Sequence, residues 1–127
     1  MRARERLEAT RASEVESGLE AALRLSEGWD GYDAKRVAEE VALFALDLLD
    51  EILPDGAPAP SVVPTPGGGV QLEWHEEKWQ LELEIVAPDH VLALGNSRPP
   101  GSLAPIEEEM HGEFERLRGW IARAQAL

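Results

Sequence analysis

The chain has 127 residues, 43% of them hydrophobic and 29% charged, which is the composition of one folded domain and excludes a disordered chain. Its 25 Asp and Glu residues outnumber 12 Lys and Arg, and the resulting net charge of −13 repels nucleic-acid phosphates and anionic lipid. The sequence contains no cysteine, which excludes disulfides, thiolate metal ligands and thiol nucleophiles.

The acidic charge is distributed along the whole chain and favours a basic protein partner, although acidity can also serve solubility alone. The first 13 residues lack an apolar segment, so they fit no secretory or organelle signal. The longest mostly apolar run, residues 41–49, contains Asp47 and is too short to span a bilayer. We therefore expect a cytoplasmic protein that binds neither membranes nor nucleic acids directly.

Apolar residues recur at helical spacing over residues 4–26 and again over residues 36–53, which predicts two helices. Gly28 ends the first of them. The apolar stripe of the second helix is so wide that we expect this helix to pack on a sheet and on another helix at once. Between the two helices, Trp29 and Tyr32 are expected to hold a tight corner.

Alternating apolar and polar residues predict a β-hairpin over residues 70–75 and 79–86, with one apolar face and one acidic face. Strands over residues 61–64 and 91–95 extend this hairpin into a meander of about four antiparallel strands. The predicted fold class is therefore α+β, with the meander packed against two or three helices in two layers.

The position of the hairpin turn predicts the pairing of its strands. A two-residue acidic turn at Glu76 and Glu77 would pair Glu73 with Gln80 and so separate the carboxylates of the polar face. On the apolar face, the same turn would stack two tryptophans across the hairpin. These are Trp74 and Trp79.

Pro88 and Asp89 predict a second turn, and a two-residue turn there would direct Leu92 and Leu94 toward the apolar face. Farther along, Pro105 opens a predicted third helix over residues 105–124. The stripe expected to be buried on this helix comprises Ile106, Met110, Phe114, Leu117 and Ile121, with Trp120 alongside.

Two short motifs stand out in the middle half of the chain. The corner EGWDGYDAKRV contributes Trp29, Asp30, Gly31, Tyr32 and Ala34, and the segment PSVVPTPGGGVQLEW contributes Pro64, Thr65, Gly68, Gly69, Val70, Leu72, Glu73 and Trp74. In these residues the chain resembles a widespread set of small uncharacterised bacterial proteins. The resemblance implies a folded family and brings no known activity with it.

The acidic face of the hairpin carries a first group of residues that could bind a divalent cation or exchange protons. It comprises Glu73, His75, Glu82 and Glu84, which combine carboxylates with an imidazole on neighbouring strands. Their spacing matches no established metal motif. A solvated polar face is the interpretation we prefer, because antiparallel sheets commonly expose one such face.

A second candidate metal site lies on the predicted third helix, where Glu107, His111 and Glu115 are four residues apart and would share one face. Glutamate-rich surface helices produce such triplets by chance, so we again prefer a solvated surface. His90, beside Asp89 in a turn, is also expected to be solvated. We expect no resident cofactor and no catalytic residues.

The leading interpretation is a non-enzymatic protein-binding module, such as an antitoxin, an immunity protein or an accessory subunit of a bacterial complex. Its partner would be a more basic protein, such as a toxin or a nuclease. The residues expected to contact it are Trp29, Tyr32, Glu73, Glu82, Glu84, Glu107, Glu108 and Trp120. The alternatives are a metal-binding protein or metal-dependent hydrolase that uses surface Glu and His residues, and a self-associating homo-oligomer.

Overall fold

The computed structural model describes residues 3–127, with side chains from Arg11 onward. Within this range the chain forms three helices, α1 (Ala3–Leu23), α2 (Glu39–Ile52) and α3 (Glu115–Gln125). It also forms five strands, β1 (Ser61–Pro64), β2 (Val70–His75), β3 (Trp79–Ala87), β4 (His90–Ser97) and β5 (Ile106–Met110). The strands form one antiparallel meander in the order β1-β2-β3-β4-β5. The α+β prediction is confirmed, with five strands in place of about four.

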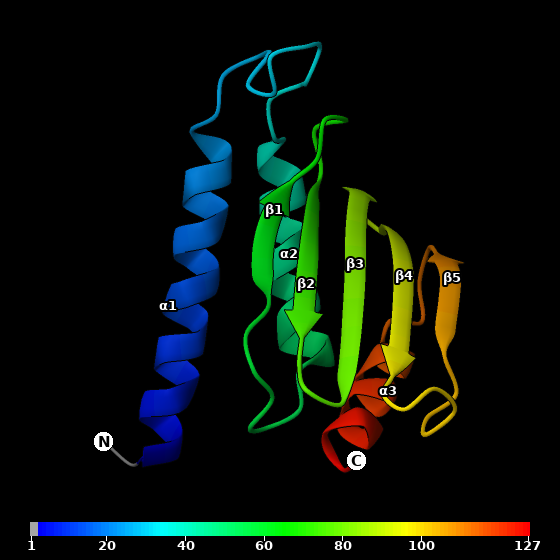
Figure 1. Ribbon diagram of the computed structural model, residues 1–127. Helices are drawn as coiled ribbons and strands as arrows, with labels where there is room; N and C mark the ends of the chain where they lie inside the picture. The colour runs from blue at the N-terminus through cyan, green and yellow to red at the C-terminus, as the bar shows by residue number, and fades with distance from the viewer. Residues whose placement is uncertain (1–2) are drawn as a thin grey trace.

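The helices leave one face of the sheet open. In Figure 1, α2 and α3 lie behind the strands, and α1 runs alongside the β1 edge. Helix α2 contacts α1, α3 and β3, which confirms its predicted central position. Helix α1 reaches β1 at Gly18, where an added Cβ would lie 3.0 Å from the Val62 side chain. Glycine at this position therefore allows the close approach of helix and strand.

The face of the sheet that meets the helices is apolar and sealed from water. Side chains alternate between the two faces along each strand, so every second residue points toward the helices. The sheet residues on this covered face that are at most 3% exposed are Val70, Leu72, Trp74, Leu81, Leu83, Ile85, Val91, Ala93 and Met110. Leu48 and Ile52 of α2 and Leu117 and Ile121 of α3 complete the same core. This burial is the main stabilising contribution to the fold.

The corner between α1 and α2 is held by hydrogen bonds rather than by aromatic packing. The Asp30 carboxylate accepts from the backbone N–H groups of Tyr32, at 2.9 Å, and Ala34, at 3.2 Å. The indole of Trp29 donates to the Lys35 carbonyl at 3.1 Å. The Tyr32 side chain is 84% exposed, so the expectation that its ring helps to hold the corner is wrong.

The two motifs that carry the family resemblance meet in space. The backbone N–H of Lys35 donates to the Pro66 carbonyl at 2.8 Å, and that of Ala38 donates to the Gly68 carbonyl at 3.0 Å. Gly68 has a φ of +94°, a conformation that favours glycine, and a Cβ at Gly69 would overlap the Ile85 carbonyl. The motif residues thus hold the corner and the β1–β2 loop together.

The predicted third helix over residues 105–124 is wrong in its first half, because residues 106–110 form β5. Ile106 and Met110 are four residues apart, a spacing that puts side chains on one face of a strand as well as of a helix. Pairing with β4 decides in favour of the strand. A helix begins only at Glu115, after Glu113 has turned the chain with a φ of +56°.

The hairpin pairing also differs from the prediction. Glu76 N–H donates to the Trp79 carbonyl, so the turn lies at Glu77 and Lys78, one position later than expected. This shift pairs Glu73 with Glu82. The expected stacking of the two hairpin tryptophans is wrong as well. Trp74 lies opposite Leu81, and the ring of Trp79 instead meets Trp120 edge-on, with centroids 6.1 Å apart.

Strand β4 presents the opposite set of side chains to that predicted. The register between β3 and β4 shifts between Ile85 and Ala87, which is the signature of a β-bulge. A shift of one residue exchanges the two faces of a strand. Val91 therefore points into the core, and Leu92 and Leu94 point to the open face, where Leu94 is 44% exposed.

Candidate functional site

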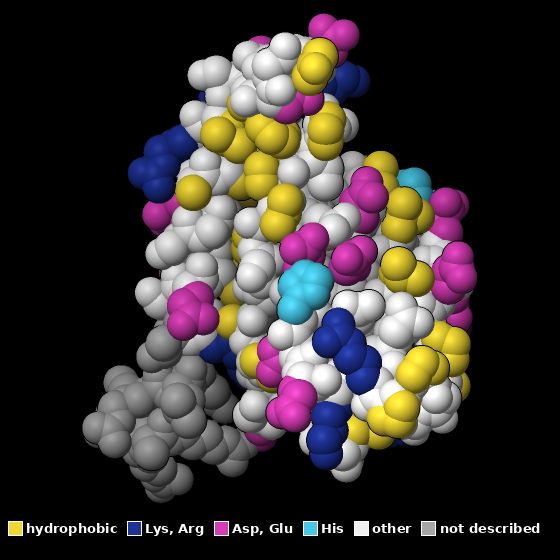
Figure 2. Space-filling model, viewed as in Figure 1, with side chains coloured by type: hydrophobic (Ala, Val, Ile, Leu, Met, Phe, Trp, Pro, Cys, Tyr) yellow, Lys and Arg dark blue, Asp and Glu magenta, His cyan; other side chains and the backbone are white. Residues whose placement is uncertain are grey.

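The open face of the sheet combines acidic and apolar side chains. In Figure 2, which views this face, acidic side chains gather over the strands with hydrophobic side chains among them. The pairing of the strands defines two rows across β3, β4 and β5. One row reads Glu84, Leu92, Glu109, and the next reads Glu82, Leu94, Glu107. Each leucine of β4 thus lies between two glutamates, and we call these six residues the Glu–Leu–Glu rows.

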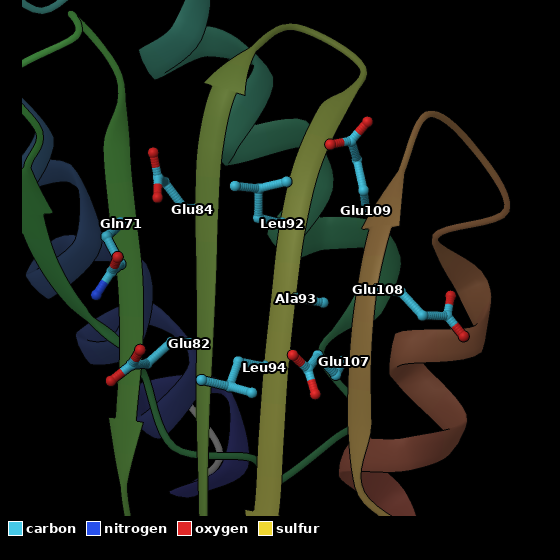
Figure 3. A pocket seen from close by; sticks show the side chains of 9 residues that line it. All are labelled: Gln71, Glu82, Glu84, Leu92, Ala93, Leu94, Glu107, Glu108 and Glu109. Carbon is cyan, nitrogen blue, oxygen red and sulfur yellow. The ribbon is translucent and has the colours of Figure 1, made fainter.

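The Glu–Leu–Glu rows line a shallow groove of about 340 Å³, which extends to Gln71 on β2. Figure 3 shows the carboxylates standing on both sides of the leucine column. Among the described residues, no cation forms an ion pair with Glu82, Glu84 or Glu107. Glu82 also faces Glu73 directly across β2 and β3, a like-charge pair that raises the local negative potential.

The other predicted contact residues lie elsewhere. Trp120 is 3% exposed, with its indole donating to the Ala104 carbonyl at 2.8 Å, so it belongs to the core and is not offered to a partner. Glu108 points to the opposite side of β5 from the rows and accepts two hydrogen bonds from Arg116, at 2.8 and 3.1 Å. This contact raises the pKa of Arg116. Trp29 and Tyr32 belong to the segment between α1 and α2, which lies beyond the end of the sheet in Figure 1.

The first predicted metal group is partly assembled. Glu73, His75 and Glu82 place one ligand atom each within 4.8 Å of one another, and Glu84 lies outside this cluster. Both carboxylate oxygens of Glu73 already have contacts, with Gln71 Nε2 at 2.7 Å and with His75 Nε2 at 3.4 Å. The cluster therefore offers one imidazole and two facing carboxylates, one of which is engaged.

The second predicted metal group does not form. Its geometry required a helix from Glu107 to Glu115, and the chain instead passes from β5 through a turn into α3. His111 lies at the end of β5, where the structure brings it together with Glu109 and His90. The hydrogen bond from His111 and then the nearby charge of His90 lower the pKa of Glu109. Finding this trio in the sequence would have required the strand pairing of β4 with β5.

Comparison with protein-family models, with curated proteins and with solved structures gave no match for this chain. The resemblance carried by the two motifs therefore remains a prediction. Among the described residues, none of the helices combines the length and the apolar character needed to cross a membrane.

Proposed function

We propose that this chain is a non-enzymatic protein-binding module that docks on a more basic protein through the open face of its sheet. The observation that carries the proposal is the pair of Glu–Leu–Glu rows, in which the exposed Leu94 and the partly buried Leu92 lie between two lines of carboxylates. In its mode of action it would resemble an antitoxin, an immunity protein or an accessory subunit of a bacterial complex, and it would act in the cytoplasm.

The leucine column supplies the apolar part of the proposed contact. Leu92 and Leu94 are two residues apart on one strand, so their side chains lie about 7 Å from each other on the same face. They are turned away from the helices, and Leu94 leaves 44% of its side chain exposed to a partner. A partner that covers them removes apolar surface from water, which favours association by roughly 25 cal/mol per Å².

The carboxylate columns determine which partner fits. An occupant with apolar side chains on its midline and Lys or Arg on both sides would cover the leucines and meet the carboxylates of β3 and β5. The net charge of −13 would accelerate the encounter with such a partner and would repel nucleic acids and anionic membranes. Rim charges of this kind act mainly on the association rate and are weakened by salt.

The test is a pull-down from lysate of the native host at low and at moderate salt, with the bound proteins identified by mass spectrometry. Three baits are compared: the unmodified chain, Glu82→Lys/Glu84→Lys on the open face, and Asp47→Lys/Glu51→Lys on the exposed side of α2. The two double variants change the net charge equally, so only the position of the charge differs.

We expect the unmodified chain and the α2 variant to capture a basic protein in stoichiometric amount, and the open-face variant to lose it. We also expect the captured amount to fall as salt rises. Equal capture by both double variants would contradict docking at the open face. An eluate without a stoichiometric protein from any bait would contradict the proposed partner and would favour self-association, which sedimentation would then detect.

A further inference from the structure

A cluster of two histidines and one glutamate occupies the corner of the open face where β4 begins and β5 ends. His90 is the first residue of β4, and His111 directly follows the last residue of β5. Because Val91 pairs with Met110, continuation of the ladder by one position places His90 opposite His111. Glu109 pairs with Leu92 and so shares their face. The cluster combines two of the three histidines in the chain.

The three side chains converge on a small volume. His111 Nε2 lies 3.2 Å from one Glu109 carboxylate oxygen, and His90 Nε2 lies 3.8 Å from the other. The two imidazole rings stack with centroids 4.5 Å apart and planes 25° from parallel. One ligand atom from each residue lies within 4.8 Å of the other two.

His90 Nε2 is a buried polar atom that lacks a hydrogen-bond partner in the described part of the chain. It is shielded from solvent and has no hydrogen-bond partner among the described residues, since 3.8 Å is too long for a hydrogen bond to Glu109. A shielded polar nitrogen without a partner is destabilising. A bound cation would supply that partner.

We propose that His90, Glu109 and His111 bind a divalent transition-metal ion of the zinc class. Two imidazoles and one carboxylate are ligands that such ions prefer, whereas magnesium and calcium prefer sites made of oxygen atoms. Ligand atoms on one tetrahedral zinc ion lie about 3.3 Å apart, given bonds of about 2.0 Å. The 3.2 Å separation of His111 and Glu109 already matches this value, whereas the 3.8 Å separation of His90 and Glu109 must shorten. The two stacked imidazole rings must also rotate so that both nitrogens point at the ion. The side chains of Glu109 and His111 are 61% and 64% exposed, so water can complete the coordination.

The site needs no docking partner, and Glu109 is the one residue that it shares with the Glu–Leu–Glu rows. It is also better suited to zinc than the cluster of Glu73, His75 and Glu82, which has one imidazole and a carboxylate already bonded to Gln71. That second cluster supplies the matched control, because His75 is also an exposed histidine on the same face.

The test measures thermal unfolding and isothermal titration of the tag-free chain with zinc chloride, and with magnesium chloride as the comparison. We expect one zinc ion per chain and a melting temperature that rises with zinc and not with magnesium. His90→Ala and His111→Ala should each weaken zinc binding by at least about 10-fold, and His75→Ala should leave it unchanged. A second readout uses the unmodified chain: zinc should shift the imidazole proton resonances of His90 and His111 and leave those of His75 in place.

Three results would overturn the site. They are a melting temperature insensitive to zinc, zinc affinity unchanged in both His90→Ala and His111→Ala, and zinc-induced shifts confined to the His75 resonances. The resonance measurement decides the matter even where a variant fails to fold, because it requires no substitution.

Discussion

The two faces of the sheet differ in composition and in burial. On the covered face most strand residues are apolar, and the central ones, such as Leu72, Leu83 and Ile85, are fully buried. On the open face, carboxylates of β3 and β5 flank the partly buried Leu92 and the exposed Leu94 of β4. The covered face is explained by folding alone. The open face is less readily explained in this way, because Leu94 leaves 44% of its side chain exposed to water. This contrast is the basis of the proposal that a partner docks on the open face.

The largest expected effect is on the free energy of unfolding, which we expect to depend much more on the covered face than on the open face. Leu83→Ala removes a fully buried side chain and leaves a cavity, so we expect the free energy of unfolding to fall by about 2–5 kcal/mol. Leu94→Ala, on a side chain that is 44% exposed, should lower it by less than about 1 kcal/mol. Urea unfolding measures both. Equal losses would show that the open face contributes to the core after all.

The next effect tests the joint between the two sequence motifs. A Cβ at Gly69 would overlap the Ile85 carbonyl, so Gly69→Ala should displace the start of β2 and lower the free energy of unfolding by roughly 1–3 kcal/mol. Gly67→Ala is the matched control, because a Cβ at that position meets nothing within 4 Å. Thermal unfolding of the two variants makes the comparison, and equal melting temperatures would refute a structural role for the motif glycine.

A smaller effect concerns repulsion on the open face. Glu82 faces Glu73 across β2 and β3, and Glu82→Gln removes the repulsion, so it should raise the free energy of unfolding by roughly 0.2–1 kcal/mol. Glu107→Gln serves as the control, since Glu107 pairs with Leu94. Urea unfolding at low salt should show the gain, and added salt should diminish it. A loss of stability in Glu82→Gln would indicate that the carboxylate is needed by the fold.

The smallest effect on stability should accompany the clearest effect on binding. Leu94→Ser should leave the melting temperature nearly unchanged, because the side chain is already exposed, and should speed dissociation of the partner captured by the unmodified chain. Glu84→Gln should instead slow association and reduce its dependence on salt. Surface plasmon resonance distinguishes the two. If the association and dissociation rates of both variants equal those of the unmodified chain, the Glu–Leu–Glu rows are not part of the binding interface.

The sequence predicted the parts of the fold that depend on local periodicity. Alternation located β2 and β3, and the wide stripe of α2 identified it as the central helix. Two features of the fold were not predicted, because they depend on how the strands pair. The bulge between Ile85 and Ala87 reversed the faces of β4, and no local signal marks it. The spacing of Ile106 and Met110 fits a strand as well as a helix, so β5 became visible only beside β4.

The arrangement of the candidate sites depends on strand pairing, which local sequence patterns do not reveal. Glu82, Glu84 and Glu107 were assigned to the surface correctly by their alternation or acidity, but their relation to the leucines required the reversed β4. The trio of His90, Glu109 and His111 combines residues from two strands, one of which was predicted to be a helix. Sequence spacing could not assemble it.

The central claim, that the open face is the docking surface, is tested most directly by methyl NMR of leucines in the complex with the captured partner. Leu92 and Leu94 report on the open face, and Leu43, which is 58% exposed on α2, is an internal reference on the helical side. We predict that the methyl resonances of Leu92 and Leu94 shift on binding and that those of Leu43 stay in place. Shifts at Leu43 with Leu92 and Leu94 unchanged would contradict the account.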